Sequence, residues 1–562
     1  MAPILSKIFH RHRPKTEDPR DIGWINSLPR DNCLTAQDII LQRLSGIVPV
    51  EMPLESWRIQ ALLVIDARCR ENVTMLEHQY VAVQKLRSEL DEHMWGAVYT
   101  YYRYLARGYQ AFINDYVKHA DQTSFDRRYL PLIVARAIHI NASIAKWRYM
   151  RYQAMPDGGW LTLHRLYLLA ESEGFGNKPL QLYEGQLEVT PGECYAQALM
   201  LDTFNRTNMT KRQIDMVDGW LAKWLKGVSI ARNFDDQRFL FYVDLGQDQG
   251  ARRIRDFKAA PSCRYWETDT LIQSIDHARK LLEEGKSMAD VGLGNACSAS
   301  AAMVILKQLF AEWSRTEYRR QRRKEDRRAV MTTATVAKGL PEVWQQVKDV
   351  AASHSRKTSG YVPVEGKSLE ERLAAHSVVA TKGGGPMIAF PGVAGERWMI
   401  SDTSQSGFGA IVGAEVANWV EIGRLVALVC DENRDEVAVG VIRNIKQRLD
   451  GRRHLGIEVL SRAAAGIQLT NKMPRAAANA TGNVRLDANL LNPSMTFMQG
   501  LLLPPDKARG LGETMLLPNA EFDPGGVYEV SQGTGHHIVQ FGQAIEQKDD
   551  WIRLDVEMPG HT

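Results

Sequence analysis

At 562 residues the chain is too long for one hydrophobic core, so we expect several domains. With 44% hydrophobic and 24% charged residues it has the composition of a folded globular protein, which excludes a chain disordered throughout. The formal net charge of +4 is too small to predict non-specific nucleic-acid binding over the whole surface. Its six cysteines form no C-x-x-C pair and have no neighbouring histidine at metal-ligand spacing, which predicts no metal site and favours a reduced, cytoplasmic compartment.

Residues 1–30 are expected to be a flexible N-terminal segment. The basic residues near the start surround only a short apolar patch and lack the long apolar core and cleavage site of a secretory signal. No stretch approaches 18 uninterrupted apolar residues. A transmembrane segment is therefore not expected.

Residues 31–315 are predicted to form a mostly α-helical domain. Between Thr74 and Trp95 apolar residues recur three and four positions apart, which predicts one helix with a single buried stripe. Another helix is predicted to begin at Thr210, because its hydroxyl can accept from a backbone amide while Gln213 reaches back in a capping box.

One strand is predicted within this domain, at the apolar run 239–243. The helix that contains Met303 and Trp313 then leads into the densest charge cluster of the chain. Between Arg315 and Arg328 this cluster has eight basic and three acidic residues. Cations at the end of a helix favour its macrodipole, so a solvated helix end is one interpretation. Binding to RNA, DNA or an anionic membrane is another.

Short strands are predicted to follow the charge cluster and to form a small antiparallel barrel or sandwich over residues 316–470. The strand pattern is broken at about 341–396, which we interpret as an insertion. Residues 471–490 resemble a linker, and 491–562 form a small β-rich C-terminal region. The predicted strands are 330–337, 411–412, 425–429, 437–442 and 455–460, then 497–503, 515–517, 527–530, 538–541 and 551–556.

A hexapeptide, Asp402-Thr-Ser404-Gln-Ser-Gly407, lies between two of these apolar stretches. Its carboxylate can accept from the Watson–Crick edge of a guanine, its hydroxyl follows two residues later on the same side of the backbone, and its glycine permits a tight turn. Upstream, Arg323-x-x-x-Arg327 offers guanidinium groups for guanine O6 and N7 and for phosphates. Taken alone, the hexapeptide is also explained as an Asx-type turn that satisfies its own backbone.

The two motifs and the segments after them resemble the PilZ domain family. This resemblance covers roughly residues 319–465 and implies a six-stranded β-barrel that binds the bacterial second messenger cyclic di-GMP. It implies that Arg322, Arg323 and Arg327 hold phosphates and the Hoogsteen edge of a guanine, that Asp402 and Ser404 meet its other edge, and that Gly407 shapes the loop. Family members commonly place a few tens of residues between the motifs, whereas here 402 minus 327 is 75.

The expected fold is thus multidomain α+β, with a mostly α-helical N-terminal domain, a PilZ-like six-stranded antiparallel barrel and a β-rich C-terminal region. The expected function is a cytoplasmic cyclic di-GMP receptor that acts on a protein partner through its helical domain, in motility, pilus or biofilm control as the family implies. No enzyme activity and no cofactor are predicted, and nucleic acid is not the expected partner. The alternatives are a PilZ-like adaptor that binds no nucleotide, and nucleic-acid or membrane binding by the arginine cluster.

Overall fold

The structure is a computed structural model that confirms the predicted fold class. It divides the chain into two compact units, Met1–Arg320 and Gln321–Thr562. In the part of the chain that the structure describes, the first is mostly helical and the second contains strands and one long helix. The residues that the structure describes are 21–48, 56–83, 87–118, 127–204, 209–255, 257–315, 327–358, 396–413, 419–448, 450–471, 497–507, 509–519, 528–532, 535–548 and 550–557.

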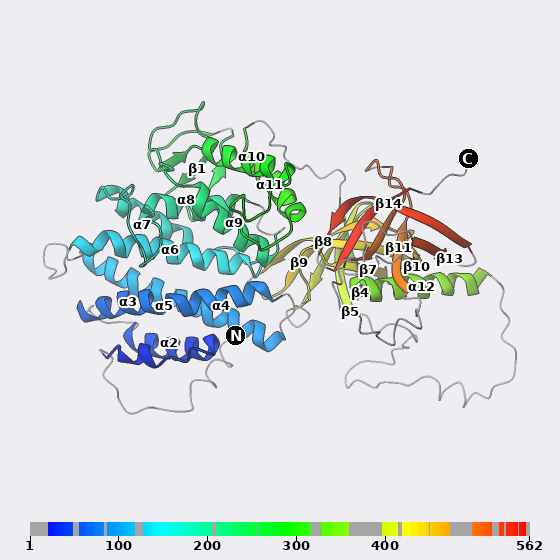
Figure 1. Ribbon diagram of the computed structural model, residues 1–562, viewed down its shortest axis with the longest axis horizontal. Helices are drawn as coiled ribbons and strands as arrows, with labels where there is room; N and C mark the ends of the chain where they lie inside the picture. The colour runs from blue at the N-terminus through cyan, green and yellow to red at the C-terminus, as the bar shows by residue number, and fades with distance from the viewer. Residues whose placement is uncertain are drawn as a thin grey trace, which may run out of the picture. The chain divides into compact units, whose positions relative to one another are not determined.

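The helical unit is built around two long neighbouring helices, α5 and α6, against which other helices pack (Figure 1). A single hydrophobic core joins all of these helices. Short 3-10 turns lie at Gly23–Ser27 and Arg127–Tyr129. The helices are α2 (Cys33–Ile47), α3 (Ser56–Arg68), α4 (Arg70–Ala82), α5 (Ser88–Lys118), α6 (Leu130–Tyr149), α7 (Gly159–Ser172), α8 (Pro191–Thr203), α9 (Lys211–Trp224), α10 (Asp269–Glu283) and α11 (Ala299–Trp313).

Local sequence signals predict some of these helices correctly but not all of them. The capping box predicted at Thr210 is confirmed, with hydrogen bonds in both directions between Thr210 and Gln213. The single helix predicted between Thr74 and Trp95 is wrong, because the segment is divided between α4 and α5. Val83, a member of the predicted buried stripe, lies at this break and is 40% exposed. The spacing of apolar residues three and four positions apart therefore continues across a boundary between helices.

A three-stranded antiparallel sheet completes the helical unit, in the order β2-β1-β3. Its strands are β1 (Phe241–Asp244), β2 (Arg252–Arg253) and β3 (Cys263–Trp266). The strand predicted at 239–243 corresponds to β1, which pairs residue by residue with β3. The prediction that this domain is not purely helical is confirmed.

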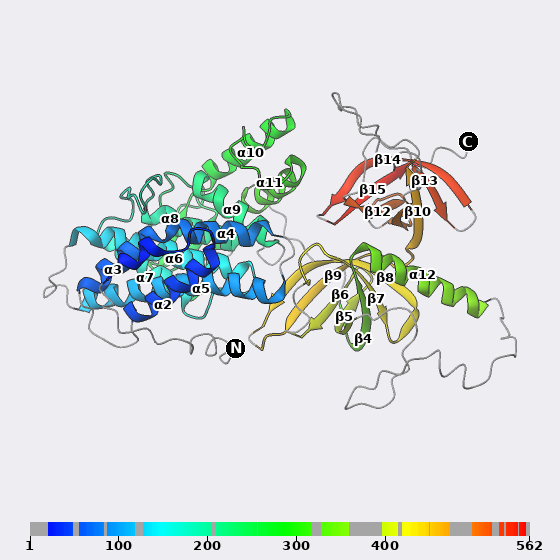
Figure 2. The same ribbon diagram turned by 60° about the horizontal axis from the view of Figure 1, so that its bottom comes forward.

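The first barrel is closed, antiparallel and six-stranded, as predicted, with the order β4-β5-β6-β9-β8-β7 (Figure 2). Buried and partly buried residues alternate along most of β9, which is the pattern of a strand with one buried face. Along β7 and the middle of β8 successive residues are buried, because the helix that follows β4 also packs against these two strands. The strands are β4 (Arg328–Lys338), β5 (Glu396–Ser404), β6 (Gly407–Val412), β7 (Leu425–Cys430), β8 (Asn433–Gln447) and β9 (Arg453–Ser461).

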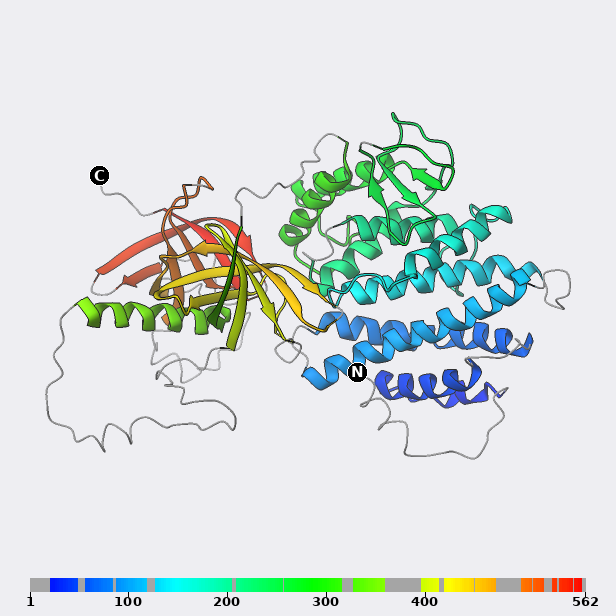
Figure 3. The ribbon, with the colours of Figure 1, turned by 180° about the vertical axis from the view of Figure 1, so that it is seen from behind.

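The segment interpreted as an insertion begins with a helix, α12 (Gly339–Thr358), which follows directly on β4 (Figure 3). Gly339 at the junction has φ +69°, a conformation that glycine adopts without strain. The apolar face of α12 includes Val343, Trp344 and Val347, which pack against both the first barrel and the strands beyond it. The helix therefore contributes to the core of this unit.

The C-terminal strands close into a second six-stranded antiparallel barrel, in the order β10-β11-β12-β15-β14-β13. Counted from its own first strand, each barrel has the order 1-2-3-6-5-4, so the topology repeats although we found no sequence repeat. From the sequence, residues up to 470 are predicted to belong to the first barrel. In the structure Ala465–Asn471 instead pairs with β11 and β13 of the second barrel. The predicted linker lies almost entirely outside the described residues. The strands are β10 (Ala465–Asn471), β11 (Phe497–Leu503), β12 (Thr514–Pro518), β13 (Tyr528–Gln532), β14 (Gly535–Gln547) and β15 (Trp551–Glu557).

The two barrels are joined by an apolar core and by an ionic network. In the core, α12 packs against Leu501, Leu516 and Trp551 of the second barrel and Leu425 of the first. The indole of Trp344 donates to the carbonyl of Ile467 at 2.9 Å. These contacts bury apolar surface from both barrels around one helix, which is the usual basis of a stable docking.

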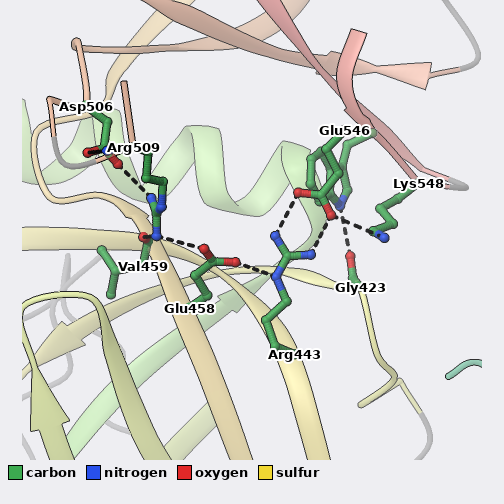
Figure 4. A network of polar contacts seen from close by, with 9 residues as sticks. Gly423, Arg443, Glu458, Val459, Asp506, Arg509, Glu546 and Lys548 are labelled. Atoms are coloured by element: carbon green, nitrogen blue, oxygen red, sulfur yellow. Dashed lines mark hydrogen bonds and ion pairs between the residues drawn. The ribbon is translucent and has the colours of Figure 1, made fainter. Parts of the chain in front are cut away.

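The ionic network is centred on Arg443 of β8, which contacts Glu546 of the second barrel and Glu458 of β9 (Figure 4). Its Nη2 lies 2.7 Å from Glu546 Oε2 and its Nε lies 2.6 Å from Glu458 Oε2. Burial alone would raise the pKa of Glu546, but the hydrogen bond and charge of Arg443 outweigh it and lower this pKa to about 2.

Acid should therefore weaken the two-barrel unit through Glu546. A carboxyl whose folded pKa of about 2 lies below its ordinary 4.5 adds stability that is complete above pH 4.5 and is lost as the pH falls toward 2. A shift of this size corresponds to about 3 kcal/mol. Urea unfolding at pH 7, 4 and 3, followed by tryptophan fluorescence, should show this loss, and Glu546→Gln should flatten the dependence. An equally steep dependence in Glu546→Gln would contradict the assignment.

Among the described residues, no helix is long and apolar enough to cross a membrane.

Candidate functional site

Arg327, the last residue of the arginine motif, meets Asp402, the first residue of the hexapeptide, at one end of the paired strands β4 and β5. Arg327 directly precedes β4, and Asp402 pairs with Ala329 on the neighbouring strand. Arg327 Nη1 lies 2.6 Å from Asp402 Oδ1, in an ion pair between side chains that are 30% and 28% exposed. Residues 75 positions apart in the chain are thus brought into direct contact.

The insertion between Arg327 and Asp402 leaves the barrel at the opposite end of strands β4 and β5. The insertion begins after Lys338 and returns at Glu396, where Val336 pairs with Glu396. Seven residues of β4 separate this pair from the Ala329–Asp402 pair, which at strand rise is about 23 Å. The chain therefore leaves and re-enters the barrel away from Arg327 and Asp402.

Asp402 lies on the outer face of the barrel because of a bulge in β5. The register shifts between Ile400 and Asp402, so one extra residue turns the following side chain outward. Its partner across the strands is Gly409, where an added Cβ would overlap the Asp402 carboxylate. Gly409 is thus needed for the position of Asp402. Sequence analysis missed it, although a second glycine two residues after Gly407 is the signal that could have found it.

The hexapeptide forms the β5–β6 turn, with Ser404 paired to Gly407. An added Cβ on Gly407 would lie 2.6 Å from the carbonyl oxygen of Ile457 on β9, so only glycine permits this close approach. The Ser404 hydroxyl lies 3.4 Å from the carbonyl oxygen of Gly407, within the turn. Arg462 donates to the carbonyl of Ser404 at 3.2 Å and places a further cation beside the turn.

Beyond Asp402 the outer face continues as a row without large side chains. Strand register places Asp402, Gly409, Gly456 and Asn444 side by side on β5, β6, β9 and β8. An added Cβ on Gly456 would lie 3.2 Å from Cβ of Asn444, which shows that both face the same side. Three strand spacings span about 14 Å. The Asp402 carboxylate lies over Gly409, so flat backbone is left at Gly456, between this carboxylate and the amide of Asn444.

Arginine side chains and ion pairs surround this surface. Burial lowers the pKa of His454, which lies on β9 two residues from Gly456, and Arg448 lowers it further while the carboxylates of Asp450 and Asp402 oppose the shift. Neutral imidazole is therefore the form expected at neutral pH. On the other side of Gly456, the Glu458 carboxylate is shared between Arg443 and Arg509.

Of the predicted site residues, the structure brings together Arg327, Asp402, Ser404 and Gly407. Arg322 and Arg323 lie outside the described residues. Nowhere in the described ranges do three or more His, Cys, Asp or Glu side chains form a group that could hold a metal ion. The arrangement offers acceptors and guanidinium donors on an open surface, which is suited to binding an anionic ligand with hydrogen-bonding edges.

Comparison with known proteins gives one family and one relative. The family described as "Cyclic-di-GMP receptor FimW, N-terminal domain" matches residues 22–233, which lie in the helical unit. The chain is also similar to the cyclic-di-GMP receptor FimW of Pseudomonas aeruginosa, with 22% identity over 560 residues, covering 91% of this chain and 86% of that protein. No solved structure matches the chain. The similarity thus extends beyond the helical unit into the barrels.

Proposed function

We propose that the chain is a cyclic di-GMP receptor and that its first barrel is a PilZ domain with the nucleotide on its outer face. The contact of Arg327 with Asp402 carries this proposal, because it unites the two halves of a bipartite motif across an insertion. The similarity over most of its length to a protein named as a cyclic-di-GMP receptor supports the same ligand. Neither observation points to an enzyme.

The ion pair of Arg327 and Asp402 places together two groups that the ligand would use. The Asp402 carboxylate would exchange Arg327 for the N1 and N2 donors of a guanine, and Arg327 would turn to O6, N7 or a phosphate. An exposed pair of this kind contributes only about 0–1 kcal/mol, so breaking it costs little. Arg322 and Arg323 would supply the remaining guanidinium groups for the two phosphates.

The absence of a side chain at Gly456 gives the ligand room. A purine whose Watson–Crick edge meets Asp402 would extend over Gly456, whereas Gly409 lies under the Asp402 carboxylate itself. Ser404 would hydrogen-bond near the same edge, and Gly407 would keep the turn close to β9. The ligand would then be held by directed hydrogen bonds to its base and by one flat contact of the base with the strand backbone. The hydrogen bonds would favour guanine over other bases.

The helical unit would carry the signal to a protein partner. Only residues 316–326 separate Arg315, the last described residue of that unit, from Arg327. This segment contains Arg322 and Arg323, so contacts of these arginines with a nucleotide would act on the connection between the units. Motility, pilus or biofilm control is the output that the family resemblance implies.

Titration calorimetry tests the proposal. Cyclic di-GMP added to the wild-type chain should give saturable heat, GTP at the same concentrations should give none, and Arg323→Ala should weaken binding. The affinity should depend on the base, whereas binding by a bare arginine cluster would weaken steeply with salt and ignore the base. Absence of heat from cyclic di-GMP with the folded wild type would contradict the receptor proposal and leave the adaptor alternative.

A further inference from the structure

The β11–β12 loop of the second barrel occupies the topological position that the nucleotide turn occupies in the first. This loop, Pro504-Pro-Asp506-Lys-Ala-Arg509-Gly510, contains no Asp-x-Ser-x-x-Gly. Instead, the Asp506 carboxylate accepts from the backbone N–H of Arg509 at 3.2 Å and from its Nη1 at 2.8 Å. Backbone hydrogen bonds of 2.9 and 3.0 Å between Asp506 and Leu511 close the loop. The loop therefore holds one arginine in a fixed direction.

That arginine reaches into the first barrel (Figure 4). Arg509 Nη2 donates to Glu458 Oε1 at 2.8 Å and to the carbonyl of Val459 at 3.0 Å. The Arg509 and Glu458 side chains are 25% and 33% exposed, so solvent screens this pair about as much as the pair of Arg327 and Asp402. The second acceptor, the carbonyl of Val459, fixes the direction of the guanidinium group.

The two residues that Arg509 contacts are those that hold the nucleotide turn in place. Glu458 pairs with Gly407, and the N–H of Val459 donates to the carbonyl of Ser406 at 2.9 Å. Because the backbones of Gly407 and Ile457 are too close for a side chain, a shift of β9 must move the turn with it.

Arg509 also neutralises a carboxylate next to the site. One oxygen of Glu458 faces Arg509, and the other accepts from Arg443 at 2.6 Å. Glu458 lies one strand from the turn, a spacing of about 4.8 Å. Without Arg509 its charge would be only half compensated, and it would repel a ligand that carries phosphates.

We propose that Arg509 is a positioning residue of the nucleotide site, supplied by the second barrel. It keeps β9 and the β5–β6 turn in place and cancels the charge of Glu458, so the second barrel, whose β11–β12 loop lacks the Asp-x-Ser-x-x-Gly sequence, supports the site of the first. This inference rests on the proposed function, because its measurable effect is on cyclic di-GMP affinity.

The test is calorimetric titration of cyclic di-GMP into full-length variants at low and high salt. Arg509→Ala should bind about fivefold to tenfold more weakly than the wild type, and the difference should shrink at high salt. In the double variant Glu458→Gln/Arg509→Ala the uncompensated charge is gone while the contact with the Val459 carbonyl is still missing, so affinity should recover in part. Arg424→Ala is the matched control, because it removes another ion pair between the barrels, to Asp550 at 3.1 Å, without contacting β9.

Each outcome bears on one statement. If the wild type binds and Arg509→Ala binds equally well, the inference is wrong while the receptor proposal stands. Equal weakening by Arg424→Ala and Arg509→Ala would also overturn it, since barrel docking alone would then set affinity. Failure of the double variant to regain affinity, with an unfolding midpoint like that of the wild type, would remove the charge argument. If the folded wild type binds no cyclic di-GMP, the proposed function fails and this inference with it.

Discussion

Asp402→Ala should weaken cyclic di-GMP binding by about 100-fold while the protein stays folded. In the proposed site this carboxylate would accept from the guanine donors, and leaving those donors unpaired costs about 2–3 kcal/mol. The substitution also frees Arg327 from its ion pair, which favours binding, but an exposed pair contributes at most about 1 kcal/mol. The loss of the acceptor therefore outweighs the release of Arg327, and the net effect is weaker binding.

Gly409→Ala should weaken binding in the same direction without removing any ligand-contacting side chain. Its new methyl group would displace the Asp402 carboxylate, and because that carboxylate is the end of a mobile side chain, the barrel can adapt. Misplacing one charge-assisted hydrogen bond corresponds to about a tenfold loss. Gly407→Ala is less informative, since its methyl group would press on the backbone of Ile457.

The control for both variants is Asp431→Ala. Asp431 also forms an exposed ion pair on the first barrel, with Arg397, and its side chain is 29% exposed against 28% for Asp402. It lies beyond the end of β7, where Thr333 also contacts it. Calorimetry should find its affinity unchanged. Equal losses in Asp402→Ala and Asp431→Ala would show a general effect on the barrel and remove Asp402 from the site.

The strands and the bipartite motif could be predicted because their signals are local. Alternating apolar residues with turns between them predict short strands, and the structure has strands at each of the predicted segments. The hexapeptide contains its own turn, so its residue types alone indicate a compact group of acceptors. For the same reason Thr210 could be predicted to begin α9.

The features that could not be predicted depend on contacts between distant segments. Strand β10 has only a weak local pattern, and its Gly466 is needed because an added Cβ would lie 2.8 Å from Cγ of Lys348 on α12. The row from Asp402 to Asn444 follows from the register of four strands and two bulges, which composition does not specify. The contact of Arg509 with Glu458 joins two barrels whose sequences show no repeat.

Trp344→Ala should destabilise the two-barrel unit by about 3–5 kcal/mol, the usual cost of removing a large aromatic side chain from a core. Trp344 is 6% exposed and packs against residues of both barrels. Its indole also donates to Ile467 at 2.9 Å, so the substitution leaves a cavity and an unpaired carbonyl in β10.

Trp344→Phe separates the two contributions, because it keeps most of the ring contact and loses only the hydrogen bond, for which we expect about 1 kcal/mol. Hydrogen exchange of the backbone amides, measured by mass spectrometry, should show faster exchange in β10, β11 and β12 of Trp344→Ala, since these strands pack on α12. Helices α5 and α6 belong to the other unit and should exchange at the wild-type rate. If protection in β10 to β12 were unchanged, α12 would not be the element that joins the barrels. The ion pairs between the barrels, formed by Arg443, Arg424 and Arg509, would then have to hold them together, and that of Arg443 with Glu546 contributes about 3 kcal/mol.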